Sequence, residues 1–198
     1  MPDGIDIEEV SAWLESEITG VKGPFTFSLI AGGRSNLTFR VTDAGGRHLV
    51  LRRPPMGAVL ATAHDMAREY RIISAVGSST VPVPPALALC TEVDVNGAPF
   101  YVMDFVDGVV LGDAGSGEDK FDAAAGRRTM EHMIEVIADL HTVDVDAIGL
   151  GDLAKKEDYL GRQLKRWRGQ WEKSKQRELP SMESSYDLLV DMKPQQRY

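Results

Sequence analysis

The chain has 198 residues, 43% of them hydrophobic, with one cysteine and a formal net charge of −8. This length suffices for the core of one domain or one and a half. The negative net charge argues against nucleic acid as the main partner, and a single cysteine, Cys90, excludes a disulfide framework. No stretch approaches the roughly twenty apolar residues that span a bilayer and the first residues, MPDG, carry no signal peptide, so we expect a cytoplasmic protein that does not bind membranes.

Residues 25–53 predict three antiparallel strands. Apolar and polar side chains alternate at the two-residue period of half-buried strands, with apolar residues at Phe25, Phe27, Leu29, Leu37, Phe39, Val41, Leu49 and Leu51. The turn at 44–47, Ala-Gly-Gly-Arg, is typical of a hairpin. The turn at 31–36 combines glycines with amides and a hydroxyl that can point at an anion. A Gly-Gly between strands is more often only a turn, so this loop alone does not establish a phosphate site.

An amphipathic helix is predicted next, with an apolar face formed by Ala63, Met66, Tyr70 and Ile73. Glu69 lies beside that face, so this carboxylate and Arg52 on the third strand can meet. Farther along, the Asn96-Gly97 pair predicts a hairpin turn because both residues accept positive φ. The second strand of that hairpin is expected at 100–106.

The C-terminal part is predicted to be helical. We place a sheet-containing lobe at 1–106, a Gly- and Asp-rich linker at 107–119 and a partial helical lobe at 120–198. Residues 155–177 carry nine Lys or Arg against three Asp or Glu, and their apolar side chains recur at helical spacing at Leu160, Leu164, Trp167 and Trp171. The charged face of this helix is either solvated or attracts an anionic ligand.

This order of elements, with a Gly loop, a strand cation and a helix carboxylate, resembles the N-terminal lobe of a kinase. The chain more particularly resembles the aminoglycoside phosphotransferase and choline kinase-like family, and within it the kinase-like domains linked to acyl-CoA dehydrogenases. The segments that carry the resemblance cover most of the chain; they are GGRSNLTFRV (32–41), LVLRRPP (49–55), REYRII (68–73), YVMDFVDG (101–108), ADLHTVDVDAIGL (138–150) and DYLGRQLKRWRGQWE (158–172).

The resemblance implies an α+β, protein-kinase-like fold. Its N-lobe is expected to hold a five-stranded antiparallel sheet with one main helix and an N-terminal helix, followed by the first helices of an α-helical C-lobe. It also implies a site for ATP with magnesium. The loop over the nucleotide phosphates is then expected to consist of Gly32, Gly33, Arg34, Ser35 and Asn36.

Arg52 is implied to be the counterpart of the family's strand lysine, with Glu69 as its helix partner. Arg53, the next residue, is the alternative for the same role. The resemblance assigns the adenine edge to backbone groups of Asp104, Phe105 and Val106, and the back of the pocket to Met103. From the residues alone, the two arginines are also compatible with solvated strand-edge charges, Glu69 with an exposed helix position and Met103 with the core.

The sequence lacks the family's catalytic motifs. The family presents its catalytic carboxylate in a His-Gly-Asp loop ending in Asn, and a magnesium ligand in a later Asp; neither motif occurs in this chain. His141-Thr142-Val143-Asp144 has His and Asp at short spacing, but it ends a helix with the apolar stripe Met130, Met133, Ile134 and Ile137. We therefore expect His141 to cap or pack at a helix end, and we assign no catalytic and no metal-binding residue.

Three hypotheses follow. The first is an ATP-dependent phosphotransferase acting on a small-molecule hydroxyl, with a hydroxyacyl-CoA among the candidate acceptors, of which this chain is the nucleotide-binding part and a missing C-terminal half holds the catalytic loop. The second is a regulatory module that binds nucleotide without catalysis. The third is a structural fragment whose exposed apolar surface leads to a homodimer or to aggregation. In the first, the basic segment at 155–177 is a candidate to attract an acyl-CoA.

Overall fold

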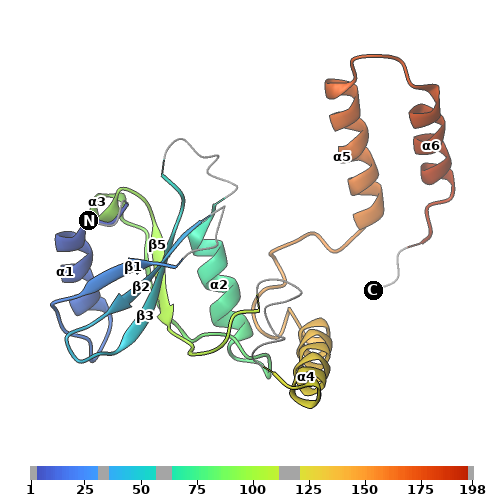
Figure 1. The fold of residues 1–198 in the computed structure, drawn as a ribbon. Helices are drawn as coiled ribbons and strands as arrows, with labels where there is room; N and C mark the ends of the chain where they lie inside the picture. The colour runs from blue at the N-terminus through green and yellow to red at the C-terminus, as the bar shows by residue number, and fades with distance from the viewer. Residues whose placement is uncertain (1–3, 31–35, 57–63, 112–120, 196–198) are drawn as a thin grey trace. The chain divides into compact units, whose positions relative to one another are not determined.

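The computed structural model describes residues 4–30, 36–56, 64–111 and 121–195 (Figure 1). The chain divides into two compact units, Met1–Leu150 and Gly151–Tyr198. Helix α4 thus belongs to the first unit, whereas the sequence prediction ended the first lobe at residue 106. Most of the predicted linker at 107–119 lies outside the described residues.

The first unit is built on a five-stranded antiparallel sheet, as predicted. Its strands are β1 (Thr26–Leu29), β2 (Leu37–Thr42), β3 (His48–Arg53), β4 (Ala86–Cys90) and β5 (Phe100–Asp104), in the spatial order β1-β2-β3-β5-β4. Arg52 lies between Thr38 of β2 and Tyr101 of β5 in the register of the sheet. This central position places the guanidinium among side chains from three strands.

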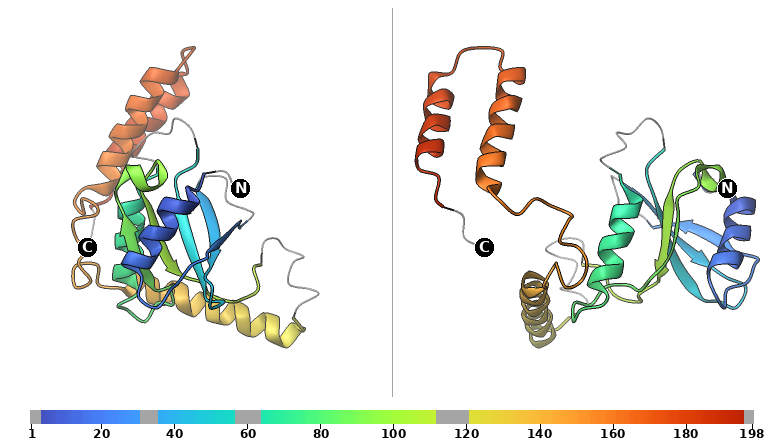
Figure 2. Two further views of the ribbon diagram at one scale, coloured as in Figure 1. Left: turned by 90° about the vertical axis from the view of Figure 1, so that its left-hand side faces the viewer. Right: turned by 180° about the vertical axis from the view of Figure 1, so that it is seen from behind.

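Helices α1 (Ile7–Glu17) and α2 (Met66–Val76) lie on opposite faces of the sheet (Figures 1 and 2). The main core fills the face toward α1, where buried side chains of the helix meet alternate residues of the strands; it includes Val10, Leu14, Phe39, Val41, Leu49, Leu51, Phe100 and Val102. The side chain of Asp6 accepts a hydrogen bond from Glu9 N at the start of α1, and that of Asp65 accepts one from Arg68 N at the start of α2.

The connection between β4 and β5 differs from the predicted two-residue hairpin. A short helix, α3 (Val93–Asn96), joins the strands and ends at Gly97, which has φ of 69°. The Oδ1 atom of Asn96 accepts a hydrogen bond from Asp6 N at 2.9 Å, so the Asn side chain serves a contact 90 residues away rather than a local turn. The prediction therefore found the antiparallel pair but had the wrong connection.

A smaller apolar cluster connects α2 to the end of the first unit. Its buried members are Val76, Val81 and Leu150, and the partly buried side chains around them include Ile72 of α2 and Val136 of α4 (Ala123–Thr142). The apolar stripe predicted on α4 is exposed, since Met130, Met133, Ile134 and Ile137 each keep 44–62% of their accessible surface. His141 lies in the last turn of α4 and is exposed, which suits the predicted cap position but not packing.

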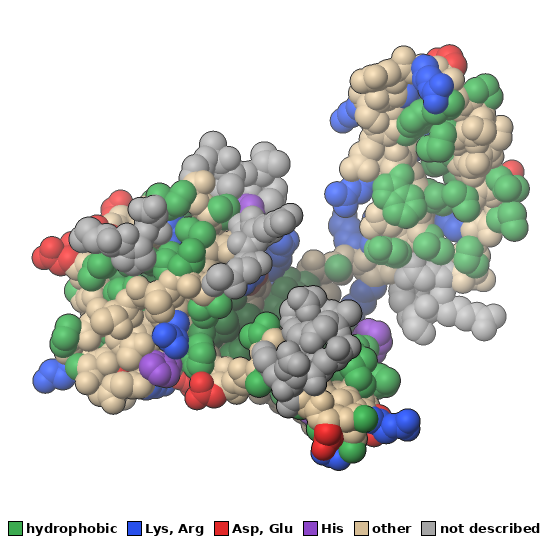
Figure 3. All heavy atoms as spheres, viewed as in Figure 1, with side chains coloured by type: hydrophobic (Ala, Val, Ile, Leu, Met, Phe, Trp, Pro, Cys, Tyr) green, Lys and Arg blue, Asp and Glu red, His purple; other side chains and the backbone are tan. Residues whose placement is uncertain are grey.

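The second unit contains a hairpin of α5 (Tyr159–Ser174) and α6 (Pro180–Asp191). Arg168 forms ion pairs with Glu172, at 2.8 Å, and with Glu183, and its guanidinium lies 5.1 Å from the ring centre of Tyr186. This cation of the basic segment is therefore occupied within the hairpin, whereas Lys165 and Arg166 are exposed. Hydrophobic side chains also gather on the surface of the hairpin (Figure 3). No helix in the described part of the chain is both long and apolar enough to cross a membrane.

The turn between β2 and β3 is a hairpin, as predicted. Asp43 N donates to Arg47 O at 3.0 Å, and Gly46, with φ of 83°, supplies the left-handed residue that a three-residue hairpin loop requires. A Cβ atom on Gly46 would meet nothing within 4 Å, so the cost of an alanine is conformational.

We predict that Gly46→Ala lowers the free energy of unfolding by about 1–2 kcal/mol, the cost of a left-handed backbone for a residue with a Cβ. Gly126→Ala is the matched control, because Gly126 lies in α4 with equally open surroundings; it should raise stability by about 0.5–1 kcal/mol through helix propensity. Urea unfolding followed by circular dichroism measures both, and effects of the same sign would contradict the assigned backbone conformations.

Candidate functional site

Arg52 and Glu69 form an ion pair between β3 and α2. The Nε atom of Arg52 lies 2.9 Å from Oε2 of Glu69, and the side chains are 34% and 30% exposed. The contact forms because Arg52 projects from the sheet face that α2 covers, and because Asp65 starts the helix four residues before Glu69. The meeting of strand cation and helix carboxylate anticipated from the sequence is therefore confirmed as a contact.

Glu69 is the centre of a wider hydrogen-bond network. Its Oε1 atom accepts from Asn36 Nδ2 at 2.9 Å, and its Oε2 atom accepts from the Tyr101 hydroxyl at 3.3 Å. Arg52 Nη1 donates to the hydroxyl of Thr38 at 3.3 Å. The carboxylate is thus held by groups from β3, β5 and the segment before β2, which fixes the direction of the Arg52 guanidinium. We name Arg52, Glu69, Asn36 and Tyr101 the clamp.

Asn36 belongs to the clamp rather than to the surface of the Gly loop. Its side chain is 5% exposed, and its Oδ1 atom lies 2.6 Å from Nδ1 of His64. The expected role in contacting phosphates therefore does not fit its side chain, both ends of which are occupied. The other members of the predicted phosphate loop, Gly32, Gly33, Arg34 and Ser35, lie outside the described residues.

Arg53, the alternative to Arg52, points to the other face of the sheet. It is 5% exposed and donates to carbonyl oxygens of Asn96 at 3.0 Å and of Pro54 at 3.2 Å. Successive residues of a strand project to opposite faces, so only one of two adjacent arginines can reach α2. The structure therefore rules out Arg53 as a partner of Glu69.

Sequence reasoning missed Tyr101 as a clamp residue. Burial and, after it, the negative charge of Glu69 raise the pKa of Tyr101 to about 12, while the positive charge of Arg52 opposes the shift. The hydroxyl therefore stays protonated and donates to Glu69 at neutral pH. The sequence did contain an indication of this role. Tyr101 and Met103 alternate with Phe100 and Val102 along β5, so they lie on the same face of the sheet as Arg52.

A cavity of about 580 Å³ lies between the sheet and the segment after β5. Its apolar lining includes Leu29, Ile30, Val50, Met103 and Val106. A smaller cavity of about 310 Å³ at the clamp is lined by Arg52, Glu69 and Tyr101, and also by Met103 and Pro84, which line the larger one. Because they share two lining residues, the cavities are adjacent, and Met103 lines both.

The three residues predicted to contact adenine differ in whether their backbone amides already have a hydrogen-bond partner. Asp104 is occupied: its backbone N donates to Pro85 O at 2.9 Å, and its carboxylate forms an ion pair with Arg47 at 2.7 Å. Phe105 and Val106 follow the end of β5, and we find no backbone partner for their amides among the described residues. Among the described residues, the backbone donors at the cavity that have no partner are therefore those at 105–106.

The described residues contain no group of three or more His, Cys, Asp or Glu side chains placed to hold a metal ion. The geometry consists of a fixed cation beside an apolar cavity, with backbone donors at its edge that have no partner in the described part of the chain. These elements can bind and orient a ligand. Catalysis of phosphoryl transfer would also need a free carboxylate beside the cation, and the described residues offer none.

Comparison with known proteins places this chain in a family. The model of the phosphotransferase enzyme family matches residues 26–197. The chain is 32% identical over 175 residues to acyl-CoA dehydrogenase family member 10 of Mus musculus, covering 88% of this chain and 16% of that protein. It is 33% identical over 172 residues to acyl-CoA dehydrogenase family member 11 of Gallus gallus, covering 87% of this chain and 22% of that protein.

A solved structure agrees in fold. The crystal structure of a "putative aminoglycoside phosphotransferase" from Ralstonia eutropha superposes with a TM-score of 0.77 and 36% identity, over 96% of this chain and 54% of that chain. This match confirms the predicted kinase-like fold. The chain spans about half the length of that protein and about a fifth of the curated relatives. The chain belongs to the phosphotransferase enzyme family.

Proposed function

We propose that this chain is the nucleotide-binding part of an ATP-dependent phosphotransferase that transfers the γ-phosphate of ATP to a hydroxyl group of a small molecule. The observation that carries this proposal is the clamp beside the apolar cavity: Arg52 is fixed by Glu69 at 2.9 Å, next to a space of about 580 Å³. Pockets for small molecules and cofactors measure roughly 300–1,000 Å³, so the space suits a nucleoside.

Arg52 is the residue that would hold phosphate oxygens. Two of its nitrogens are engaged, Nε by Glu69 and Nη1 by Thr38, and the described residues offer no partner to Nη2. Arginine remains cationic in proteins and its planar fork suits phosphate. Glu69 would set the plane of this fork, the role that the helix carboxylate has in kinases.

The larger cavity would receive the base and the ribose. Val50 and Met103 supply apolar contacts, and the amides of Phe105 and Val106 supply donors for one edge of the base. Of the backbone groups of Asp104 expected at the adenine edge, the amide is already used by Pro85, so only the carbonyl oxygen remains in this assignment.

We assign the chemical step to residues outside this sequence. Phosphoryl transfer needs a carboxylate at the acceptor hydroxyl and magnesium ions on the phosphates; the sequence contains no His-Gly-Asp loop, and the described residues form no metal cluster. Arg52 and its neighbours bind and orient, and magnesium bound with ATP supplies charge neutralisation. A module that binds nucleotide without catalysis is the second candidate, favoured by the same observation on metal ligands.

For the acceptor we propose a hydroxyacyl-CoA, supported by the relatives named for acyl-CoA dehydrogenation. Lys165 and Arg166 are two of the exposed cations of the basic segment and precede Arg168 on α5; they could attract its phosphates, whereas Arg168 is bound to Glu183. We expect Lys165→Gln with Arg166→Gln to weaken hydroxyacyl-CoA binding by about tenfold, and Arg127→Gln with Arg128→Gln, on exposed positions of α4, to leave it unchanged. Equal affinities in fluorescence titrations would contradict the assignment.

Calorimetric titration of magnesium-ATP into the purified chain tests nucleotide binding. We expect saturable binding that Arg52→Ala weakens by at least about tenfold, because the charge-assisted contact is lost, and that Arg52→Lys retains in part. Arg168→Ala is the matched control: Arg168 also forms an ion pair at similar exposure, 32%, but belongs to the second unit and lines neither cavity. Absence of binding by a folded, monodisperse chain would overturn the proposal. Binding without any turnover in the presence of the complementary half would favour the second candidate.

The clamp also predicts a change of stability with alkaline pH. The pKa of Tyr101 is about 12 in the folded chain, against an ordinary value of 10. Between these values the unfolded chain loses the proton while the folded chain keeps it, so the free energy of unfolding should fall as pH rises from 10 toward 12. We expect Tyr101→Phe to lose less stability over this range in urea unfolding, and Glu69→Gln to reduce the loss as well, because the charge of Glu69 raises this pKa. Parallel curves for wild type and Tyr101→Phe would contradict the assignment.

A further inference from the structure

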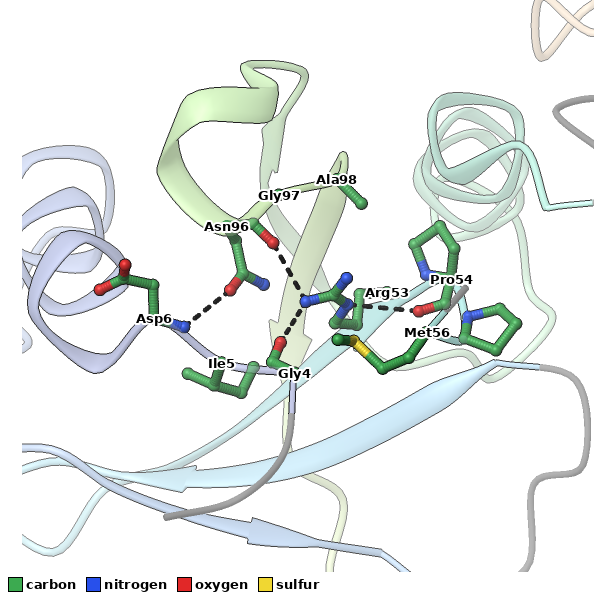
Figure 4. A pocket seen from close by; sticks show the side chains of 10 residues that line it. Gly4, Ile5, Asp6, Arg53, Pro54, Met56, Asn96, Gly97 and Ala98 are labelled. Carbon is green, nitrogen blue, oxygen red and sulfur yellow. Dashed lines mark hydrogen bonds between the residues drawn. The ribbon is translucent and has the colours of Figure 1, made fainter. Parts of the chain in front are cut away.

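A third cavity, of about 470 Å³, lies at the end of β3 on the face of the sheet toward α1 (Figure 4). It is bounded by the segment that leads into α1, by the residues after β3 and by the end of α3. It shares no lining residue with the two cavities at the clamp. Its chemistry is set by two buried side chains, Arg53 and Asn96.

Arg53 is a buried cation without a counter-charge among the described residues. It is 5% exposed, and its hydrogen bonds go to the carbonyl oxygens of Gly4, Asn96 and Pro54, all of them neutral acceptors. The described residues place no carboxylate within ion-pair distance of it and no acceptor at Nη2. Burial lowers its pKa from the ordinary value, yet a guanidinium remains charged in proteins. A buried charge in this condition is costly unless an anion accompanies it.

Asn96 adds a second unused donor at the same place. It is 5% exposed, and its Oδ1 atom accepts from the backbone N–H of Asp6 at 2.9 Å. Because an N–H group can only donate, this bond fixes the orientation of the amide and turns Nδ2 away from Asp6. The Nδ2 atom is buried and has no hydrogen-bond partner among the described residues. In Figure 4 this nitrogen lies beside the guanidinium of Arg53.

The remaining lining supplies no acceptor for these donors among the residues that the structure describes. The carboxylate of Asp6 caps α1 by accepting from Glu9 N, and Figure 4 shows it directed away from Arg53. The other side chains of the lining are apolar: Ile5, Pro54, Pro55, Met56 and Ala98. A water molecule could accept from both donors, but it would leave the charge of Arg53 uncompensated.

We propose that this cavity binds a small organic carboxylate. One oxygen accepts from Nη2 of Arg53; the other accepts from Nδ2 of Asn96, which is covered in this structure and is uncovered by a small movement of its neighbours when the ligand binds. The apolar body of the ligand contacts Ile5, Pro54 and Met56. A monoanion matches the single unpaired cation, whereas a phosphate dianion would bring more charge and more acceptor oxygens than two donors and an apolar wall can satisfy.

The test compares two ligands of nearly equal shape, benzoate and benzamide, titrated into the full chain by ¹H–¹⁵N NMR. We expect saturable shifts of the Asn96 side-chain amide with benzoate, and binding of benzamide at least about tenfold weaker because it lacks the charge. Arg52→Ala, which changes the clamp only, should leave benzoate affinity unchanged. Equal binding of both ligands, or tighter binding of inorganic phosphate than of benzoate, would overturn the proposal.

Asn96→Asp is the decisive variant because it is close in shape to the original residue. One carboxylate oxygen can still accept from Asp6 N–H, while the other replaces the unused donor with an acceptor for Arg53. We expect this variant to have an unchanged or higher melting temperature and to lose benzoate binding, since its own carboxylate occupies the site. Retained benzoate affinity in a folded Asn96→Asp chain would overturn the proposal. A lower melting temperature with benzoate binding lost would also count against it, because Arg53 would then not accept a carboxylate at this place.

Discussion

The alternation of side chains along β3 is the constraint on which both sites depend. Within His48–Arg53, Leu49 and Leu51 are fully buried in the core under α1, and Arg53 continues on that face. Arg52, one residue earlier, projects toward α2. A slip of one residue in this strand would send both leucines out of the core and exchange the two arginines. The burial of the apolar side chains therefore fixes which cation reaches which cavity.

The clamp is better understood as a positioning device than as a source of stability. An ion pair as exposed as Arg52–Glu69 contributes at most about 1 kcal/mol. Its geometry is nevertheless well determined, since Glu69 also accepts from Asn36 and from Tyr101 and α2 is held from two sides. One side of α2 faces β4 and β5, and Ile72, Ala75 and Val76 contribute to the second cluster with Val136 of α4. The position of Glu69 thus depends on packing that extends to Leu150.

Sequence patterns over a few neighbouring residues predicted those parts of the site that depend only on the secondary structure of single elements. The two-residue period indicated the strands, the apolar face indicated α2, and together they predicted that Arg52 and Glu69 could meet. They did not predict the bonds of Asn36 to Glu69, 33 residues away, or of Asn96 to Asp6, 90 residues away. Asn in a turn is locally typical of a residue that tolerates positive φ. In the tertiary structure both side chains instead form long-range hydrogen bonds. The side chain of Asn36 is therefore engaged by Glu69 rather than open to a phosphate, and Asn96 ends a short helix rather than forming a two-residue hairpin turn.

The two adjacent arginines also show how burial changes what one residue type does. Arg52 is partly exposed and has a carboxylate partner, so its charge is compensated, and its Nη2 atom has no partner among the described residues. Arg53 is buried and has only carbonyl partners, so its charge is balanced by nothing that the structure describes. The same energetic rule, that a buried charge needs a counter-charge, is met at the first position by Glu69 and left open at the second. In the part of the chain that the structure describes, the fold therefore joins a preformed clamp on one face of the sheet to a buried cation without a counter-charge on the other.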